Sequence, residues 1–292
     1  MSKTLIYADE ISIKHTAKIY SYPCGIMDIV ASSSPDFGPK GWERAEDFSH
    51  PKKQIMVTEC NHDEIEERRP GAALEDLERS MRRAKGKLRR LALANDFKYF
   101  VTLTLDPSKV DSHDGAAVVR KLNAWCSNMV QRHGLRYILV PERHKKGGIH
   151  FHGFFNDALA AVDSGFIRVP WAKKPRKPRS AADRQEWLAA GGRIVYNLPG
   201  WTLGFTTAMD LYGAYPAAVS YVCKYIGKDG EKPAGRWYYS GGDLHEPEIS
   251  YAEISAADLA AEFDGKCWVG YVPGRQIAVV NGLQVHDKVQ RE

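Results

Sequence analysis

The 292-residue sequence has no uninterrupted apolar stretch of about 18 residues, the length that a membrane-spanning helix requires. Its first residues, "MSKTLIYADEISIKH", also lack the long apolar core of a secretory signal peptide. We therefore expect a cytoplasmic protein that has no membrane partner.

Cysteine is scarce, and two common motifs are missing. The five cysteines are odd in number and never form C-x-x-C, which argues against a disulfide framework or a thiolate zinc site and fits a reducing compartment. The sequence also has no G-x-x-x-x-G-K-[ST], so it carries no P-loop ATPase motif.

Positive charge is modest in total but concentrated in two places. The net charge is +5, and the stretches "RRAKGKLRR" (82–90) and "KKPRKPR" (173–179) contain no acidic residue. Such a cluster is usually a solvated face, but two of them on either side of a candidate site favour contact with nucleic acid. The candidate DNA-binding residues are Arg82, Arg83, Lys85, Lys173, Lys174, Arg176 and Lys177.

Hydrophobic periodicity predicts an α+β fold. Apolar residues at helical spacing run from Leu74 to Leu91, and alternating strand patterns follow. Residues 156–192 read as a long basic insertion. The other predicted elements are a strand at 97–107, a helix at 116–134 closed by Gly134, a hairpin of strands 136–142 and 149–155, a strand at 200–211, and a helix at 215–230. The hairpin makes the sheet at least partly antiparallel, with helices packed on it.

The strand "IHFHGFF" contains a candidate metal site. Because side chains alternate along a strand, His150 and His152 share one face, opposite the core-facing Ile149 and Phe151. Glu142 lies on the partner strand, where a hairpin can bring it beside the imidazoles. A hard divalent cation prefers such a carboxylate as a further ligand. His144, in the turn, is a rival third ligand.

The helix "YVCKYIGK" offers candidate nucleophiles. At about 100° per residue, Tyr221, Lys224, Tyr225 and Lys228 fall on one face. A phenol becomes a useful nucleophile when its target is a phosphodiester polarised by a metal ion, and a nearby lysine can stabilise the developing charge. The product would be a phosphotyrosine link to one DNA end, with a free hydroxyl on the other.

Three motifs in this order resemble the rolling-circle replication initiators of the HUH endonuclease superfamily. "FVTLTLDP" is similar to their first motif, "HFH" to the second and "YVCKYIGK" to the third, in the two-tyrosine form of phage and plasmid Rep proteins. The downstream "GRWYYSGGDL" (235–244) is also similar, and the resemblance covers roughly residues 80–245.

The resemblance implies a ferredoxin-like central antiparallel sheet and a specific chemistry. Glu142, His150 and His152 would bind Mg²⁺ or Mn²⁺, Tyr221 and Tyr225 would be the nucleophiles, and Lys224 and Lys228 would assist them electrostatically. The protein would nick and rejoin one strand at an origin through a 5′-phosphotyrosine intermediate. Its partners would be single-stranded or supercoiled origin DNA and the helicase and polymerase of a bacterial host cell.

Three alternatives stay open at this point. A transposase or mobilisation relaxase of the same superfamily would use the same chemistry for another purpose. The chain could also be a non-catalytic single-stranded nucleic-acid-binding module. Finally, one of the two tyrosines could stack on DNA instead of attacking it.

The expected organisation has three segments. Residues 1–73 form an N-terminal region to which no role is assigned, residues 74–245 form the HUH endonuclease domain with its basic insertion at about 156–192, and residues 246–292 form a C-terminal extension.

Overall fold

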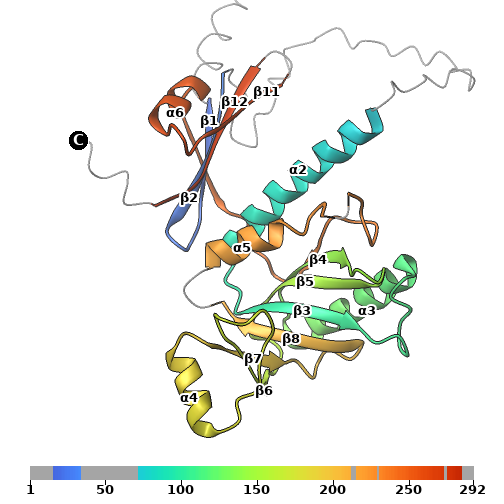
Figure 1. Cartoon of the computed structure of the whole chain (residues 1–292). Coiled ribbons are helices and arrows are strands. Elements are labelled where there is room, and N and C mark those ends of the chain that lie inside the picture. The colour runs from blue at the N-terminus through green and yellow to red at the C-terminus, as the bar shows by residue number, and fades with distance from the viewer. Residues whose placement is uncertain (1–15, 34–71, 212–214, 229, 273–274, 285–292) are drawn as a thin grey trace, which may run out of the picture. The chain divides into compact units, whose positions relative to one another are not determined.

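The computed structural model describes residues 16–33, 72–211, 215–228, 230–272 and 275–284 (Figure 1). The chain forms two compact units, one from Met1–Glu75 with Glu248–Glu292 and the other from Asp76–Pro247. Most of the segment 1–73 lies outside the described residues.

The first unit is a five-stranded sheet that joins both ends of the chain. Its strand order is β10-β1-β2-β12-β11, and Ile19, Ile29 and Val280 lie in its buried core with Leu259 of α6. The bounds are β1 (Ala17–Ser21), β2 (Ile26–Ser32), β10 (Glu248–Ala252), α6 (Ala256–Glu262), β11 (Trp268–Val272) and β12 (Arg275–Gln284). The two chain ends, expected as separate segments, therefore contribute strands to the same sheet.

The second unit is built on a seven-stranded antiparallel sheet of order β6-β7-β8-β3-β5-β4-β9. The strands are β3 (Tyr99–Leu105), β4 (Tyr137–Arg143), β5 (Ile149–Phe155), β6 (Val162–Arg168), β7 (Arg193–Asn197), β8 (Gly204–Asp210) and β9 (Tyr239–Gly241). The helices are α2 (Ala72–Leu93), α3 (Gly115–His133), α4 (Ala181–Ala189) and α5 (Tyr215–Cys223). The predicted α+β class is confirmed, and the arrangement is compatible with a ferredoxin-like sheet carrying helices.

Alternation along the strands separates a core face from a polar face. In β3, Tyr99, Val101 and Leu103 are buried in a cluster with Leu122 and Trp125 of α3. The amphipathic helix α3 starts at the Asp114 cap, whose side chain accepts hydrogen bonds from two backbone N–H groups, and ends at Gly134 in the left-handed region. The residues between the buried positions of β3 face the opposite side, where the candidate site lies.

The β4–β5 hairpin requires a glycine in the middle of its second strand. A Cβ atom on Gly153 would come within 1.8 Å of the backbone oxygen of Ile138. Gly153 pairs with Leu139 across the hairpin, so a side chain there would push the two strands apart. This close approach holds β4 and β5 in the register that the candidate metal ligands need.

Two elements differ from the sequence-based expectation. The basic insertion 156–192 is structured, because β6 pairs with β7 and extends the sheet, and α4 follows with Ser180 as its cap. The helix predicted at 215–230 ends at Cys223. Beyond it the chain forms tighter turns, with hydrogen bonds from Lys224 N to Tyr221 O and from Tyr225 N to Val222 O, and Gly227 at φ 78° breaks the helical course.

Candidate metal and tyrosine site

Strand register assembles the predicted metal ligands. Glu142 of β4 pairs with His150 of β5, and His150 pairs in turn with Thr104 of β3. One row further along, His152 of β5 pairs with Thr102 of β3. Because residues two apart in a strand share a face, both histidines and the carboxylate lie on the side of the sheet opposite α3.

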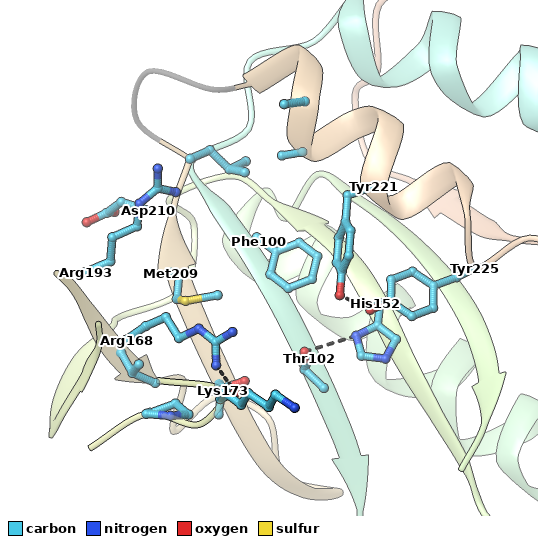
Figure 2. A pocket seen from close by; sticks show the side chains of 16 residues that line it. Phe100, Thr102, His152, Arg168, Lys173, Arg193, Met209, Asp210, Tyr221 and Tyr225 are labelled. Carbon is cyan, nitrogen blue, oxygen red and sulfur yellow. Dashed lines mark hydrogen bonds between the residues drawn. The ribbon is translucent and has the colours of Figure 1, made fainter. Parts of the chain in front are cut away.

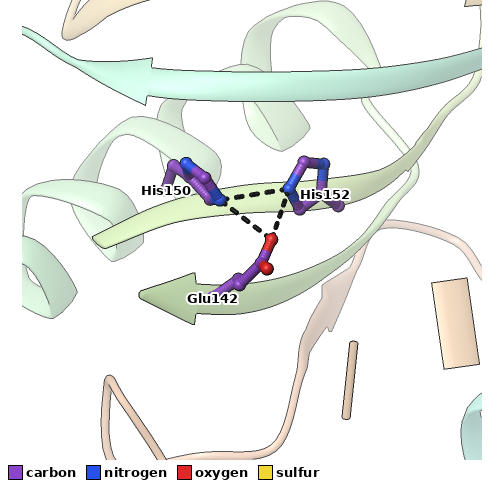
Figure 3. A group of neighbouring side chains, drawn as sticks. All are labelled: Glu142, His150 and His152. Atoms are coloured by element: carbon purple, nitrogen blue, oxygen red, sulfur yellow. Dashed lines mark hydrogen bonds and ion pairs between the residues drawn. The ribbon is translucent and has the colours of Figure 1, made fainter. Parts of the chain in front are cut away.

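Three side-chain atoms converge in this cluster (Figure 3). Glu142 Oε2 lies 2.9 Å from His150 Nε2 and 2.8 Å from His152 Nε2, and the two imidazole nitrogens are 3.2 Å apart. Glu142 and His152 are buried, and His150 is half-buried. Glu142, His150 and His152 therefore form a group that could hold a metal ion.

The donor set suits a divalent cation. His152 Nδ1 lies 3.1 Å from the hydroxyl of Thr102, and the tautomer that donates to this hydroxyl turns a bare Nε2 toward Glu142. A bare nitrogen and a carboxylate oxygen at 2.8 Å repel each other unless a proton or a cation lies between them. Imidazole nitrogen and carboxylate oxygen are ligands that Mn²⁺ and related ions accept.

The ionisation states favour the ligand forms. Burial, together with the neighbouring His150, lowers the pKa of His152 to about 4, so its imidazole is neutral at pH 7. Burial acts to raise the pKa of the Glu142 carboxyl, but hydrogen bonds from Lys228 and His150 outweigh it and lower that pKa. A neutral imidazole beside an ionised carboxylate is the combination that binds a metal ion.

The predicted tyrosines lie directly beside this cluster (Figure 2). The ring of Tyr225 stacks on His152 with centroids 4.2 Å apart and an interplanar angle of 14°. Its hydroxyl donates to the Tyr221 hydroxyl at 2.5 Å, and the two rings meet edge to face at 5.2 Å. Tyr221 also packs edge to face on Phe100 of β3. Both hydroxyls therefore meet at one place next to a candidate metal ligand.

The two tyrosines differ in exposure and in acidity. Tyr221 is 49% exposed, whereas Tyr225 is half-buried. Burial raises the pKa of the Tyr225 phenol above its usual range, and its hydrogen bond to Tyr221 and the nearby Glu142 carboxylate act in the same direction. Forming a phenolate here therefore needs added positive charge.

The two predicted lysines take different positions. Lys228 forms an ion pair with Glu142 Oε1, the carboxylate oxygen that faces away from the histidines, and its ammonium lies 5.5 Å from the Tyr225 ring centroid. Lys224 is exposed on the turn between the tyrosines. The rival ligand His144 is exposed, with its ring centroid 5.7 Å from that of His150.

The predicted DNA-binding residues divide into two groups. Lys173 lines a pocket beside Tyr221, and the neighbouring Lys174, Arg176 and Lys177 are exposed in the segment between β6 and α4. On α2, Arg82 pairs with Glu78 at 3.5 Å, Arg83 is exposed and Lys85 is half-buried.

The pocket contains residues that the sequence did not single out. It has a volume of about 630 Å³ and reaches from His152 and the tyrosines to β7 (Figure 2). Arg168 of β6 and Arg193 of β7 line it, together with Phe100. Their separation in the sequence hides them, because only the pairing of β6 with β7 brings the two arginines together.

Comparison with known proteins gives one match. Residues 98–230, less than half of the chain, match a family model described as replication-associated protein, of the ORF2 type. Neither the search of curated proteins nor that of solved structures returned a match. Among the described residues, every helix is too short or too polar to cross a bilayer. The resemblance drawn from the three motifs is confirmed for the matched part of the chain.

Proposed function

Because residues 98–230 match a family of replication-associated proteins, we propose that this chain initiates rolling-circle replication of a phage or plasmid. It would do so as a metal-dependent tyrosine DNA endonuclease and strand transferase of the HUH type. Its substrate would be single-stranded or supercoiled origin DNA, and a host helicase and polymerase would continue from the nick.

One observation carries the proposal. The hydroxyls of Tyr221 and Tyr225 are 2.5 Å apart, and the Tyr225 ring stacks on His152, a member of the group Glu142, His150 and His152. Nucleophile and electrophile activator must lie within one phosphate of each other for in-line attack. The two candidate parts of the site meet this requirement.

Each residue then has a defined role. Glu142, His150 and His152 would hold Mg²⁺ or Mn²⁺, which when bound supplies a Lewis acid for a phosphate oxygen. Lys228 neutralises part of the Glu142 charge, which makes a phenolate on Tyr225 less costly. The exposed Lys224 can contact the DNA phosphate or an attacking phenolate.

The proposed step conserves the phosphodiester energy. A tyrosine Oη attacks the phosphorus, the new P–Oη bond forms, and the bond from phosphorus to the 3′ oxygen breaks. The phenol releases its proton, and the leaving oxygen takes up a proton to become a 3′ hydroxyl. The 5′ end stays attached to the protein, and attack by a 3′ hydroxyl reverses the step and rejoins a strand.

A transposase or relaxase would share this chemistry, and the family match favours replication. A non-catalytic binding module is the alternative of another class. It would bind single strands whether or not metal and tyrosine hydroxyls are present.

A covalent-capture assay tests the proposal. The full chain is incubated with Mn²⁺ and a 3′-labelled single-stranded DNA library of random internal sequence, and the products are separated under denaturing conditions. We expect labelled protein, because the fragment that carries the original 3′ end would be linked through its 5′ phosphate. Sequencing the attached DNA would identify the preferred site.

Three controls make the assay decisive. Chelation of the metal and the double variant Tyr221→Phe/Tyr225→Phe should each abolish the adduct, whereas Tyr271→Phe, an exposed tyrosine of β11, should leave it unchanged. An adduct that persists in the double variant would contradict the assignment. The absence of any adduct from the unaltered chain, with binding intact, would favour the non-catalytic module.

A further inference from the structure

The pocket beside Tyr221 combines an apolar floor with a basic rim (Figure 2). Phe100 of β3, Met209 of β8 and Val195 of β7 line it from the sheet, and Ala217 and Tyr221 line it from α5. Its volume of about 630 Å³ lies within the ~300–1,000 Å³ typical of small-ligand sites. The pocket opens next to His152, so its occupant would lie beside the candidate metal ligands.

The rim holds two arginines in direct opposition. Arg168 of β6 pairs in register with Arg193 of β7, and like charges directly opposite each other destabilise a strand pair. The Arg168 guanidinium donates to the backbone oxygen of Lys173, which also lines the pocket. Among the described lining residues these three cations face one carboxylate, that of Asp210. An anion between the arginines would remove their repulsion.

The apolar part is suited to an aromatic ring. Phe100 and Tyr221 meet edge to face at 5.9 Å, so they present two differently oriented ring surfaces to the pocket. Tyr221 is 49% exposed, which leaves much of its ring accessible. Stacking on such rings is how proteins hold single-stranded bases without reading their sequence.

We propose that this pocket binds one nucleotide of single-stranded DNA adjacent to the phosphate that is cut. The base lies against Phe100 and Tyr221, and its phosphate lies between Arg168 and Arg193. The extension of the sheet by β6 and β7 is then the part of the fold that holds the substrate strand. The inference rests on the proposed function in that the strand bound here is the strand that is nicked.

Two variants separate the charge from the cavity. Arg168→Ala/Arg193→Ala removes two positive charges from the rim, and Arg120→Ala/Lys121→Ala removes two from exposed positions of α3, on the opposite face of the sheet. Met209→Trp keeps every charge and fills the floor of the pocket. Circular dichroism and thermal melts verify that each variant is folded.

Binding is measured by fluorescence anisotropy of the full chain with labelled oligothymidine, and with an abasic oligomer of equal length, in the presence of a chelator. We expect Arg168→Ala/Arg193→Ala to weaken binding of both oligomers roughly tenfold more than the α3 control does. Met209→Trp should weaken binding of oligothymidine roughly tenfold and leave the abasic oligomer unaffected.

The inference is overturned if the rim variant binds like the α3 control, or if Met209→Trp binds oligothymidine like the unaltered chain. Because the chelator prevents nicking, these measurements do not depend on cleavage. Unchanged binding together with normal adduct formation would refute the pocket alone. The expected binding changes together with a missing adduct would refute the nicking chemistry and leave a nucleotide pocket.

Discussion

At the scale of single residues, the candidate site depends on hydrogen bonds that orient its ligands. His152 is held by its Nδ1 contact with Thr102 at 3.1 Å and by the stacked ring of Tyr225. Partners behind a metal ligand fix its tautomer and ring orientation, and losing one typically lowers metal affinity ~10–100-fold. Thr102 therefore has a testable positioning role.

We expect Thr102→Val to weaken Mn²⁺ binding about tenfold, because valine keeps the shape of threonine but cannot accept the Nδ1 proton. Isothermal titration of the full chain with Mn²⁺ measures the change. Thr207→Val, the exposed partner of Thr102 on β8, is the matched control and should bind as the unaltered chain does. Equal affinities for the two variants would contradict the positioning role.

A second residue-scale prediction concerns Cys126. Burial raises the pKa of its thiol to about 12, so at pH 8 only roughly 10⁻⁴ of it is the reactive thiolate. Because the pKa is raised, reactivity should appear only as the pH rises far above 8 or when the chain unfolds. Alkylation with iodoacetamide, followed by mass spectrometry, should label the exposed Cys24 and spare Cys126 in the native protein. Equal labelling of both cysteines would contradict the buried position.

The site shows how far residue-level reasoning from sequence reaches. The pairing of Glu142 with His150 follows from a short hairpin and strand alternation, both of which are local in sequence. Arg168 and Arg193 are 25 positions apart, and a register shift between Asp163 and Phe166 sets which residues oppose them. No local pattern encodes that register, so the sequence did not reveal the rim of the pocket.

At the scale of elements, the segment after α5 determines where the tyrosines point. A continuous helix was expected to residue 230, but the chain tightens after Cys223 and turns at Gly227. Helical periodicity predicted correctly that Tyr221 and Tyr225 share a side, because three-residue turns change their relative angle only slightly. It could not predict the end of the helix, since the close approach of Gly227 to Met81 of α2 is a tertiary contact.

Gly227→Ala tests this turn. The position has φ 78°, and a Cβ atom would lie 2.0 Å from Met81 Sδ, so we expect alanine to combine backbone strain of ~1–3 kcal/mol with a clash. Gly230→Ala is the matched control, because its φ is 70° and a Cβ there meets no atom within 4 Å. Urea denaturation should show the larger loss for Gly227→Ala, accompanied by reduced adduct formation.

The role of the Met81 contact can be isolated further. Met81→Ala combined with Gly227→Ala should recover part of the lost stability, because the smaller side chain makes room for the new Cβ. The turn assignment would be wrong if Gly227→Ala and Gly230→Ala were equally stable and equally active.

At the scale of the whole molecule, the chain carries a net charge of +5 with its basic stretches set apart in the sequence. Binding of single strands through phosphate contacts releases counterions, so log K should fall linearly with log[salt], by about 0.7 per phosphate contacted. We expect His150→Ala to keep this slope and affinity while losing adduct formation, because it alters a candidate ligand and not the basic surface. Anisotropy titrations at several salt concentrations measure both quantities.

The result has a clear contrary outcome. If His150→Ala abolishes strand binding, the cluster Glu142, His150 and His152 serves to hold DNA or the fold rather than to support nicking. A thermal melt of the variant distinguishes these two cases.

Sequence reasoning was also uneven at this scale. The core of the second unit was predicted well, because its helices and strands are long and strongly periodic. The sheet that joins β1 and β2 to β10 and β12 was not predicted. Its strands come from opposite ends of the chain, and a single sequence gives no signal for pairing across more than 200 residues.

The shared hydrogen bond of Tyr221 and Tyr225 has a mechanical consequence. Since the two oxygens occupy neighbouring points 2.5 Å apart, a DNA end attached to one already stands within reach of the other. Handing a strand between them would need a bond rotation in a side chain and no rearrangement of the backbone. A single ion would be enough to serve both partners in turn.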